Sequence, residues 1–548
     1  MNDHKKSWWQ HEVIYQIYPR SFQDSNGDGI GDLPGILSRL DYLDALGIKS
    51  LWISPIYPSP MADFGYDISD YVNVHPMFGT LNDFDALVAE VHKRSMKLIL
   101  DLVPNHTSDQ HPWFIESRSS RDNPKRDWYL WHDPRPDGEL PNNWRASFGG
   151  PGWELDHRTN QYYFHAFAKE QPDLNWRNPQ VQEAMLDVMR FWLKRGVDGF
   201  RIDVLWHMIK DVQFRDNPVN PDYQPHMSTY DGLLPFYSTD QFEVHDIVKK
   251  MRKVLDESGD KIMIGEIYLP ISKLVTYYGA DNSGVHLPFN FQLLMLPWSS
   301  QKISNTIQEY EAALPRDGWP NWVLGNHDQP RIASRIGPDQ ARVAAILLFT
   351  LRGTPTIYYG EEIGMRDVPI PAAEIVDPQG LNMPDKDLSR DPARTPMQWN
   401  ESANAGFSAA KPWLRLARGY QKINVEAQAN DPGSMLMLYR KLIHLRNGEL
   451  SLSDGNYVPV YADHQVLSYI RRREGSDAFL TVLNFTHRTC RFRPPNLSFA
   501  GIIEISTSPE LEGLMVEDSL ELSGDEGVVV RLQRSQEHVA NAIKGKTA

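Results

Sequence analysis

Cysteine and long apolar runs are scarce in this chain. Cys490 is the single cysteine among 548 residues, so no intramolecular disulfide can form, which fits a reducing compartment. The N-terminal segment MNDHKKSWW contains no apolar core of signal-peptide length, and no later run is long enough to cross a bilayer. We therefore expect a cytoplasmic protein that has no membrane partner.

An excess of positive charge is also missing. Lysine and arginine number 56 against 71 aspartate and glutamate residues, which gives a net charge of −15. A nucleic-acid or anionic-membrane partner would require a basic surface, so the composition argues against both. With 41% hydrophobic and 23% charged residues, the chain has the composition of a globular protein and is long enough for two or three domains.

Aromatic residues are plentiful by contrast. The chain has 16 tryptophans and 23 tyrosines, and several lie in polar, loop-like segments, among them Trp128, Tyr129, Trp131, Trp144 and Trp153. Aromatic rings in loops around a cleft can stack on the apolar face of a sugar ring. The same rings can equally form the core of a small subdomain, and the sequence leaves both interpretations open.

Short apolar strands alternate with amphipathic helices over the first four-fifths of the chain. This order predicts an α/β fold, a parallel (β/α)8 TIM barrel. An open doubly wound sheet is the alternative, but no glycine-rich phosphate loop follows the first strand. The expected strands cover residues 13–18, 50–54, 97–103, 199–204, 261–267, 286–291, 321–325 and 354–359. The expected helices cover residues 37–46, 81–94, 181–194, 244–256 and 340–351.

One connection is too long for an ordinary barrel loop. It follows the third strand and is rich in Trp, Pro, Asp, Asn and Arg, and a loop of that length usually carries its own small fold. Near the C-terminus the helix–strand alternation gives way to short strands divided by turn residues. The predicted division is barrel 1–104, inserted subdomain 105–172, barrel 173–455 and C-terminal antiparallel β-domain 456–548. We expect a final helix or a frayed end after Gln533.

Acidic residues stand at the ends of three predicted strands: Asp203, Glu266 and Asp328. Side chains alternate along a strand, so Arg201 and Asp203 point to the same side, where the guanidinium keeps the carboxylate ionised. An apolar segment precedes Glu266 and is expected to raise the pKa of its carboxyl group. Hydrolysis of a glycosidic bond needs two carboxylates. Asp203 suits the nucleophile and Glu266 the acid, while Asp328, next to His327, suits a group that holds sugar hydroxyls and stabilises positive charge.

Three further polar residues follow predicted strands. Asp63 and Tyr66 follow the second strand, and His106 follows the third. Aspartate and histidine side chains can hydrogen-bond sugar hydroxyls, and a tyrosine ring can form the floor beneath a sugar. Each residue is a weak signal by itself, because a lone histidine at a strand end is more often structural. Their shared position at the C-terminal ends of successive strands favours one site.

The first loop, DSNGDGIGD, has the composition of a cation site. Oxygen donors at alternate positions, with glycines between them, suit a hard cation such as Ca²⁺. Asp24, Asn26, Asp28 and Asp32 would supply side-chain oxygens and Ile30 its backbone carbonyl. The loop is similar to the first part of an EF-hand loop without the distal glutamate. The alternative is a turn that binds no metal; we predict a cation that makes the loop rigid.

Five segments, in order, resemble the α-amylase family of glycoside hydrolases. They are DLVPNH ending at His106, QPDLNW beginning at Gln171, GFRID ending at Asp203, GE ending at Glu266 and NHD ending at Asp328. Together they span most of the chain. The N-terminal WW…YQIYPRSF, the first loop, GEEIG and RDPARTPMQW are similar to the exo-acting α-glucosidase and oligo-1,6-glucosidase branch of that family.

This resemblance implies a retaining double displacement. Asp203 would be the nucleophile, Glu266 the acid/base and Asp328 the stabiliser of the transition state. The first loop would hold Ca²⁺, or Mg²⁺ in its place. The residues implied to surround the terminal glucose are Asp63, Tyr66, His106, Arg201, His327 and Arg390.

The expected partner is a small oligosaccharide, and the oligomeric state is either a monomer or a homodimer. Val204, after the nucleophile, resembles members that accept α-1,6 bonds, whereas residues 214–218 resemble members that prefer short α-1,4 substrates. A glucosyl transferase, or a sucrose or maltose isomerase, on the same scaffold is the first alternative. A catalytically dead barrel that serves as a transporter subunit is the second, and the presence of all three carboxylates argues against it.

Overall fold

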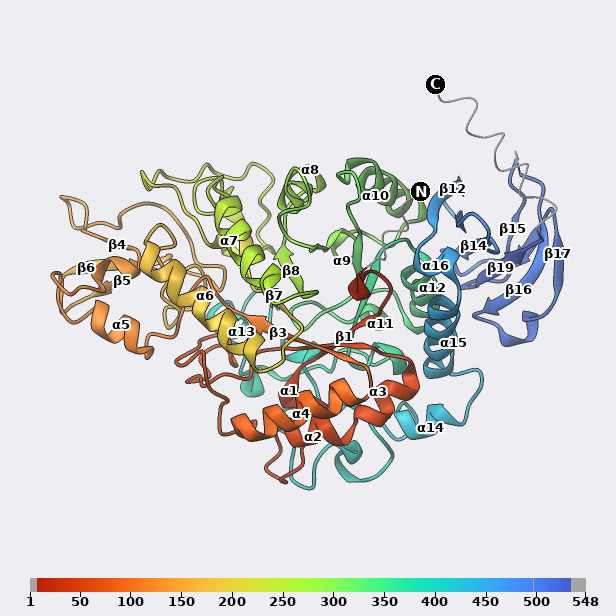
Figure 1. The fold of residues 1–548 in the computed structure, drawn as a ribbon, viewed down its shortest axis with the longest axis horizontal. Helices are drawn as coiled ribbons and strands as arrows, with labels where there is room; N and C mark the ends of the chain where they lie inside the picture. Colours follow the sequence, from red (N-terminus) through yellow and green to blue (C-terminus); the bar gives the residue numbers. More distant parts are fainter. Residues whose placement is uncertain (1–6, 496, 534–548) are drawn as a thin grey trace.

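A parallel β-barrel lies at the centre of the computed structural model, which describes residues 7–495 and 497–533 (Figure 1). Its strands follow the order β10-β11-β1-β2-β3-β7-β8-β9, with parallel pairing throughout. Because β9 also contacts β10, the barrel is nearly closed. The strands are β1 (Ile14–Ile17), β2 (Ser50–Ile53), β3 (Lys97–Leu102), β7 (Gly199–Ile202), β8 (Ile262–Ile267), β9 (Leu287–Asn290), β10 (Asn321–Val323) and β11 (Thr354–Tyr358). The predicted TIM barrel is confirmed.

Helices cover the outside of this barrel. In α6 and α7 the buried residues are apolar and recur at helical spacing, whereas α12 is buried along most of its length. At the start of α4, Thr80 and Asp83 form a capping box, which satisfies two backbone donors of the first turn. The predicted helices that the structure confirms are α4 (Leu81–Lys93), α6 (Pro179–Lys194), α7 (Val244–Asp256) and α12 (Pro338–Thr350), and α10 (Ser300–Ala313) completes the layer.

The helix predicted over residues 37–46 is wrong in its boundaries. The structure has two helices there, α2 (Leu33–Ser38) and α3 (Leu40–Leu46), which meet at Arg39. Arg39 has φ −109° and ψ 6°, outside the helical range. Its guanidinium lies 4.1 Å from the centre of the Trp399 ring. This tertiary contact outweighs the helical periodicity.

The barrel interior changes from apolar to polar along the strands. Side chains two residues apart on a strand point the same way, so each strand places one inward residue in each layer. The apolar layer includes Ile14, Ile99, Ile264, Leu287 and Val323. The buried polar layer, nearer the C-terminal ends of the strands, includes Gln16, Asp101, Arg201 and Glu266. The charged groups are therefore gathered where a TIM barrel carries its active site.

The long connection between β3 and α6 forms a small subdomain at one side of the barrel (Figure 1, left). It contains α5 (Pro112–Ser117) and a sheet in the order β4-β6-β5, made of Trp131–His132, Gln161–Phe164 and Trp153–Asp156. Trp144 and Trp153 are buried together with Phe164 in a core of their own. For these two tryptophans the core interpretation is therefore correct.

A C-terminal antiparallel sheet packs against the other side of the barrel (Figure 1, right). Leu467 and Tyr469 pack into the main core, whereas Val466 and Ile470, on the opposite face, join a second core. The predicted β-domain is confirmed; its exact boundaries stay predictions, and the end expected after Gln533 lies outside the described residues. The sheet consists of β12 (Asn456–Ala462), β13 (Val466–Arg472), β14 (Phe479–Asn484), β19 (Gly527–Leu532), β16 (Ala500–Ser506) and β17 (Met515–Glu517), with β15 (Cys490–Phe492) and β18 (Leu520–Leu522) paired beside it.

Candidate active site

Arg201 lies at the centre of a first group of carboxylates. It comes from β7 and is fully buried. Its Nη1 donates to the two oxygens of Asp101 at 2.9 and 3.1 Å and to Oδ1 of Asp203 at 2.6 Å. Its Nη2 lies 2.8 Å from Oε2 of Glu266. One cation thus joins carboxylates from β3, from the turn after β7 and from β8, and we call these four residues the Arg201 cluster.

Val204 turns the chain sharply behind Asp203. The prediction that β7 extends to Val204 is wrong, because the strand ends at Ile202 and Val204 has φ 38° and ψ 45°. This left-handed conformation is strained for a β-branched residue. It directs the Val204 N–H toward Oε2 of Glu266, which accepts it at 2.8 Å. Strain in this turn therefore accompanies a contact that orients the Glu266 carboxyl group.

The Arg201 cluster has more negative than positive groups. Burial raises the pKa values of Asp101, Asp203 and Glu266, and that of Asp101 is about 6. Arg201 opposes this effect by stabilising the charged forms, but one guanidinium faces three carboxylates that repel one another. The carboxyl groups titrate as one coupled system, and we infer that the cluster retains a proton near neutral pH.

Asp328 belongs to a second group that contains two arginines. Nη1 of Arg390 and Nη2 of Arg394 reach Oδ1 of Asp328 at 3.2 and 2.9 Å. Nη2 of Arg390 also lies 2.6 Å from Oδ1 of Asp63 and 2.6 Å from Oδ1 of Asp377. These contacts join the loops after β2, β10 and β11 across the barrel mouth. We call the five residues the Arg390 cluster.

The Asp328 carboxyl group is held in its charged form. Burial alone raises its pKa, but His327, Arg390 and Arg394 together hold the pKa well below its usual range. Burial also lowers the pKa of His327 far below its usual value, so the two arginines carry the positive charge next to Asp328. A permanently ionised carboxylate at the barrel mouth can stabilise positive charge that develops on a bound substrate.

Tyr66 and His327 connect the two clusters. Their rings are stacked, with centroids 5.3 Å apart and planes inclined by 7°. The Gln16 amide lies 2.7 Å from Nδ1 of His327, and Nε2 of His327 lies 2.7 Å from the hydroxyl of Tyr66. If the amide donates to Nδ1, the proton of neutral His327 is on Nε2. The Tyr66 hydroxyl can then donate to Oδ2 of Asp101 at 3.0 Å.

His106 lies on the side of the site next to the inserted subdomain. Its Nε2 is 3.1 Å from the carbonyl oxygen of Tyr66 and 3.1 Å from the amide of Gln171. The same amide donates to Oδ2 of Asp63 at 3.1 Å. Burial lowers the pKa of His106 to about 4, so the imidazole is neutral at pH 7. The structure therefore brings all nine predicted catalytic and substrate-binding residues into one connected region; their roles stay predictions.

Sequence reasoning assigned no role to four residues that organise this site. Asp101, Gln171 and Arg394 stand in segments that carry the family resemblance, and this proximity was an available signal. Asp377 had none. Its carboxylate accepts from the backbone N–H, Nε and Nη2 of Arg390 at 2.9, 2.8 and 2.6 Å, and only the folded chain shows that contact.

The first loop, residues 24–32, is stabilised by hydrogen bonds from its backbone N–H groups to its own side-chain oxygens. Asp24 accepts three backbone N–H groups, Asn26 and Asp28 accept one each, and Asp32 caps α2. These donor types, with the carbonyl of Ile30, fit a hard cation. However, within the described residues no group of three or more acidic, histidine or cysteine side chains is arranged to hold a metal ion. The predicted ligands also include the Asn26 amide and the Ile30 carbonyl, which are not among these side chains, so the cation stays a prediction.

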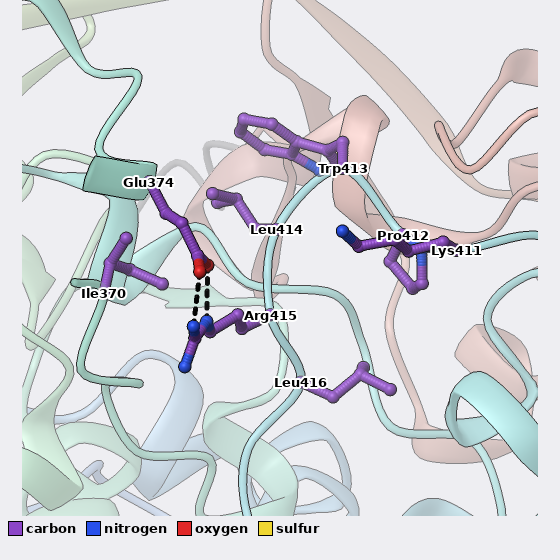
Figure 2. Close-up of a pocket in the computed structure, with 8 residues that line it drawn as sticks. All are labelled: Ile370, Glu374, Lys411, Pro412, Trp413, Leu414, Arg415 and Leu416. Atoms are coloured by element: carbon purple, nitrogen blue, oxygen red, sulfur yellow. Dashed lines mark hydrogen bonds and ion pairs between the residues drawn. The ribbon is translucent and has the colours of Figure 1, made fainter. Parts of the chain in front are cut away.

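A pocket of about 540 Å³ lies outside both clusters (Figure 2). Trp413 lines it, and the Trp413 Nε1 donates to Oγ of Ser21 at 3.0 Å. Figure 2 shows Glu374 and Arg415 joined across the pocket. None of the predicted catalytic or substrate-binding residues lines it, so this pocket is not the candidate active site.

Comparison with known proteins agrees with this geometry. Residues 16–455 match the family described as alpha amylase, catalytic domain. The chain belongs to the α-amylase family and is a glycoside hydrolase. It is 41% identical to an oligo-1,6-glucosidase of Parageobacillus thermoglucosidasius, over 90% of this chain and 93% of that protein. It is 43% identical to an alpha-glucosidase of Culex pipiens, over 87% of this chain and 82% of that protein.

Solved structures of the family superimpose closely. The alpha-glucosyl transfer enzyme XgtA has a TM-score of 0.91 and 38% identity, covering 96% of this chain and 100% of that chain. The trehalulose synthase MutB of Pseudomonas mesoacidophila MX-45 has a TM-score of 0.89 and 36% identity, with the same coverage of both chains. The scaffold is therefore shared by proteins that are named as glucosidases, as a glucosyl transfer enzyme and as a trehalulose synthase.

Proposed function

We propose that this family member is a retaining, exo-acting α-glucosidase that removes terminal glucose from the non-reducing ends of short oligosaccharides. In the first step, an Asp203 oxygen attacks the anomeric carbon. The bond to the leaving oxygen breaks, and Glu266 gives its proton to that oxygen. The products of this step are a glucosyl group bound covalently to Asp203 and a shortened sugar.

In the second step water replaces the leaving sugar. Ionised Glu266 removes a proton from the water, the water oxygen bonds to the anomeric carbon, and Asp203 departs as a carboxylate. Two inversions at the same carbon give net retention. Asp328, held ionised by two arginines, would stabilise the positive charge that builds on the sugar in both steps.

The observation that carries this proposal is the contact of one buried arginine with both reacting carboxyl groups. Arg201 lies 2.6 Å from Asp203 and 2.8 Å from Glu266. The two carboxyl groups share this one guanidinium and titrate as a coupled pair. The retaining mechanism requires Asp203 to be ionised and the shared proton to lie on Glu266. Exo action is supported by the Asp63–Arg390 ion pair at 2.6 Å, because it joins two loops across one side of the site, where it would block the passage of a continuing sugar chain.

The test is the kinetics of three variants on maltose, isomaltose and p-nitrophenyl α-glucoside. Asp203→Ala, Glu266→Gln and Asp328→Ala should each fold and lose at least about a thousandfold in kcat. Azide added to the Asp203 variant should restore turnover by replacing the missing nucleophile and giving a β-glucosyl azide. Near-normal hydrolysis by the Asp203 variant would exclude this residue as the nucleophile.

Glucosyl transfer is a second candidate, favoured by the likeness to XgtA and MutB. A solved glutamate-to-glutamine mutant of MutB contains the substrate sucrose. Both reactions share the glucosyl-enzyme and differ in whether water or a sugar attacks it. Product analysis with sucrose and maltose at high concentration separates them, because free glucose indicates hydrolysis and isomeric disaccharides indicate transfer.

We propose that the substrates include α-1,6 as well as α-1,4 bonds. The support is the likeness to oligo-1,6-glucosidases, which extends over most of the chain, and Val204 directly behind Asp203. Initial rates on isomaltose, maltose, sucrose, trehalose and longer maltooligosaccharides would measure both linkage preference and chain length. Equal rates on long and short chains would contradict the preference for short oligosaccharides.

Three further expectations concern the surroundings of the enzyme. Across the described part of the chain, no helix has the length and apolar character needed to span a membrane. A cytoplasmic location and a monomeric or homodimeric state stay predictions. The Ca²⁺ prediction, with Mg²⁺ as its alternative, is tested by chelation: EDTA should lower the unfolding temperature, and the bound cation should restore it.

A further inference from the structure

The loop of residues 59–67 carries two predicted sugar-binding residues in an unusual backbone conformation. Asp63 and Tyr66 belong to this loop, and Met61 and Phe64 in it have φ values of 68° and 46°. Residues other than glycine seldom adopt positive φ values. Such a segment keeps its shape only when contacts elsewhere stabilise it.

The carboxylate of Asp67 provides those contacts. It is completely buried. Its Oδ1 accepts the hydroxyl of Ser59 at 2.8 Å and the N–H of Asp63 at 2.9 Å, and its Oδ2 accepts the N–H of Ala62 at 2.8 Å. Ser59 in turn accepts the N–H of Met61 at 2.9 Å. One side chain therefore ties both ends and the middle of the loop together.

No cation neutralises this carboxylate among the residues that the structure describes. The Asp63 carboxylate opposes ionisation of Asp67. Charged and titratable groups around the loop contact its other residues. Arg390 binds Asp63, Arg20 contacts Met61 and His75 bonds the backbone of Ser59. His106 lies beside the carbonyl of Tyr66, and Asp101 and His327 contact the Tyr66 hydroxyl. The ionised form is therefore stabilised only by its three hydrogen-bond donors.

We infer that Asp67 is a positioning residue whose ionisation holds Asp63 and Tyr66 in the glucose pocket. Burial raises the pKa of Asp67 to about 6. Above that pH the carboxylate accepts three donors. Below it, the added proton turns an accepting oxygen into a donor that faces other donors, and unsatisfied buried donors are costly. The loop then releases its two sugar-binding residues, and substrate affinity falls.

This inference rests on the proposed function, because activity is one of its readouts. The titration of Asp67 is distinct from the titration of the Arg201 cluster. Asp67 has no contact with Asp203 or Glu266. A change confined to Ser59 alters the environment of Asp67 and leaves the reacting carboxyl groups in place. Substitution of Ser59 can therefore show whether the acid limb of kcat/KM comes from Asp67 or from the Arg201 cluster.

Ser59→Ala is the decisive variant. It removes one donor to the ionised form, so the pKa of Asp67 should rise and the acid limb of kcat/KM should move up by about one pH unit. The change should lie in KM, and kcat/KM at pH 8 should stay within about twofold of the unmodified enzyme. Ser69→Ala is the matched control, because the Ser69 hydroxyl donates to the carbonyl of Pro58 and does not touch Asp67; its profile should not move.

Asp67→Asn provides the second measurement. The amide cannot titrate and cannot accept at all three donors, so kcat/KM should fall about tenfold at pH 8, and the contribution of Asp67 to the acid limb should disappear. The inference would be overturned by two results together. The acid limbs of kcat/KM for Ser59→Ala and the unmodified enzyme would coincide, and Asp67→Asn would lose the same factor in kcat/KM at every pH. Asp67 would then be a structural residue only.

Hydrogen exchange of the peptide that contains Ala62 and Asp63 gives a readout independent of catalysis. After correction for intrinsic rates, protection should fall below about pH 6 in the unmodified enzyme and at a higher pH in Ser59→Ala. Protection that stays constant with pH overturns the inference even if the enzyme is active. Absence of all α-glucosidase activity with the expected exchange pattern would instead reject the proposed function alone.

Discussion

The Arg201 cluster and the Arg390 cluster share one barrel mouth but hold their carboxyl groups in different states. Each contains three carboxylates, all of them buried except Asp328, whose side chain is 22% exposed. The first has one arginine and the second has two. Burial raises the pKa values of Asp203 and Glu266 in the first cluster, whereas that of Asp328 in the second lies well below its usual range.

The comparison shows that the ratio of cations to carboxylates determines which carboxyl group can donate a proton and which stays ionised. A cluster with too few cations must keep a proton, and a group that keeps a proton near neutral pH can donate it. In the cluster with an additional cation, the arginines hold the pKa values of Asp328 and Asp377 below their usual range, whereas burial raises the pKa of Asp63. Proton transfer is therefore expected at Glu266 and constant electrostatic stabilisation at Asp328.

The largest effect is expected from removing the single cation of the first cluster. Arg201→Ala leaves three buried carboxylates without a neighbouring cation and should lower the free energy of unfolding by about 3–5 kcal/mol. It should also lower kcat/KM by at least about a thousandfold. Thermal unfolding and initial rates measure the two effects. Arg201→Lys is the matched variant, and recovery to within tenfold would show that charge alone is sufficient, without the planar fork of arginine.

The next effect concerns the pH profile. Asp328→Asn should lower kcat by about a hundredfold or more. The charge of Asp328 raises the pKa of Glu266, so the Glu266 limb should move to lower pH, and neither limb should disappear, because Asp328 itself is ionised throughout the working range. Glu266 acts when protonated, so activity should fall as pH rises through its raised pKa; Asp203 acts when ionised, so activity should fall as pH drops. A limb that disappears in Asp328→Asn would contradict the division between the clusters.

A smaller effect is expected at Asp377, which anchors Arg390 through three contacts. Asp377→Asn keeps the shape and removes the negative charge. Arg390 should then be less well placed toward Asp63 and Asp328, and KM should rise about tenfold. Steady-state kinetics with maltose measures this change. An unchanged KM would show that Asp63 and Asp328 hold Arg390 without help.

The smallest effect is expected at an exposed ion pair. Arg415 and Glu374 are joined in the pocket of Figure 2, and both side chains are 48% exposed. Such pairs contribute about 0–1 kcal/mol. Glu374→Ala should therefore change kcat/KM by less than about twofold and leave the unfolding temperature nearly unchanged. A large loss would mean that this pocket, and not the two clusters alone, takes part in substrate binding.

Much of this site could be predicted from local sequence. Asp203 and Asp328 follow short apolar strands and Glu266 lies near the end of one, and parallel strands in a barrel place such ends together. The exact backbone at Val204 could not be predicted, because periodicity describes a strand and gives no sign of a left-handed turn. Asp377 was missed for a different reason: it lies far along the chain from Asp63 and Asp328, within an irregular segment.

The sequence by itself determined the barrel, the inserted subdomain, the C-terminal sheet and the identity of the three carboxylates, because these depend on periodicity and on residue type. The tertiary structure alone decided how many cations each carboxylate faces and how deeply it is buried. Those two quantities set the charge states, since burial and Coulomb interactions act between residues that are distant in the chain. The chemical difference between Glu266 and Asp328 is therefore a property of the folded protein.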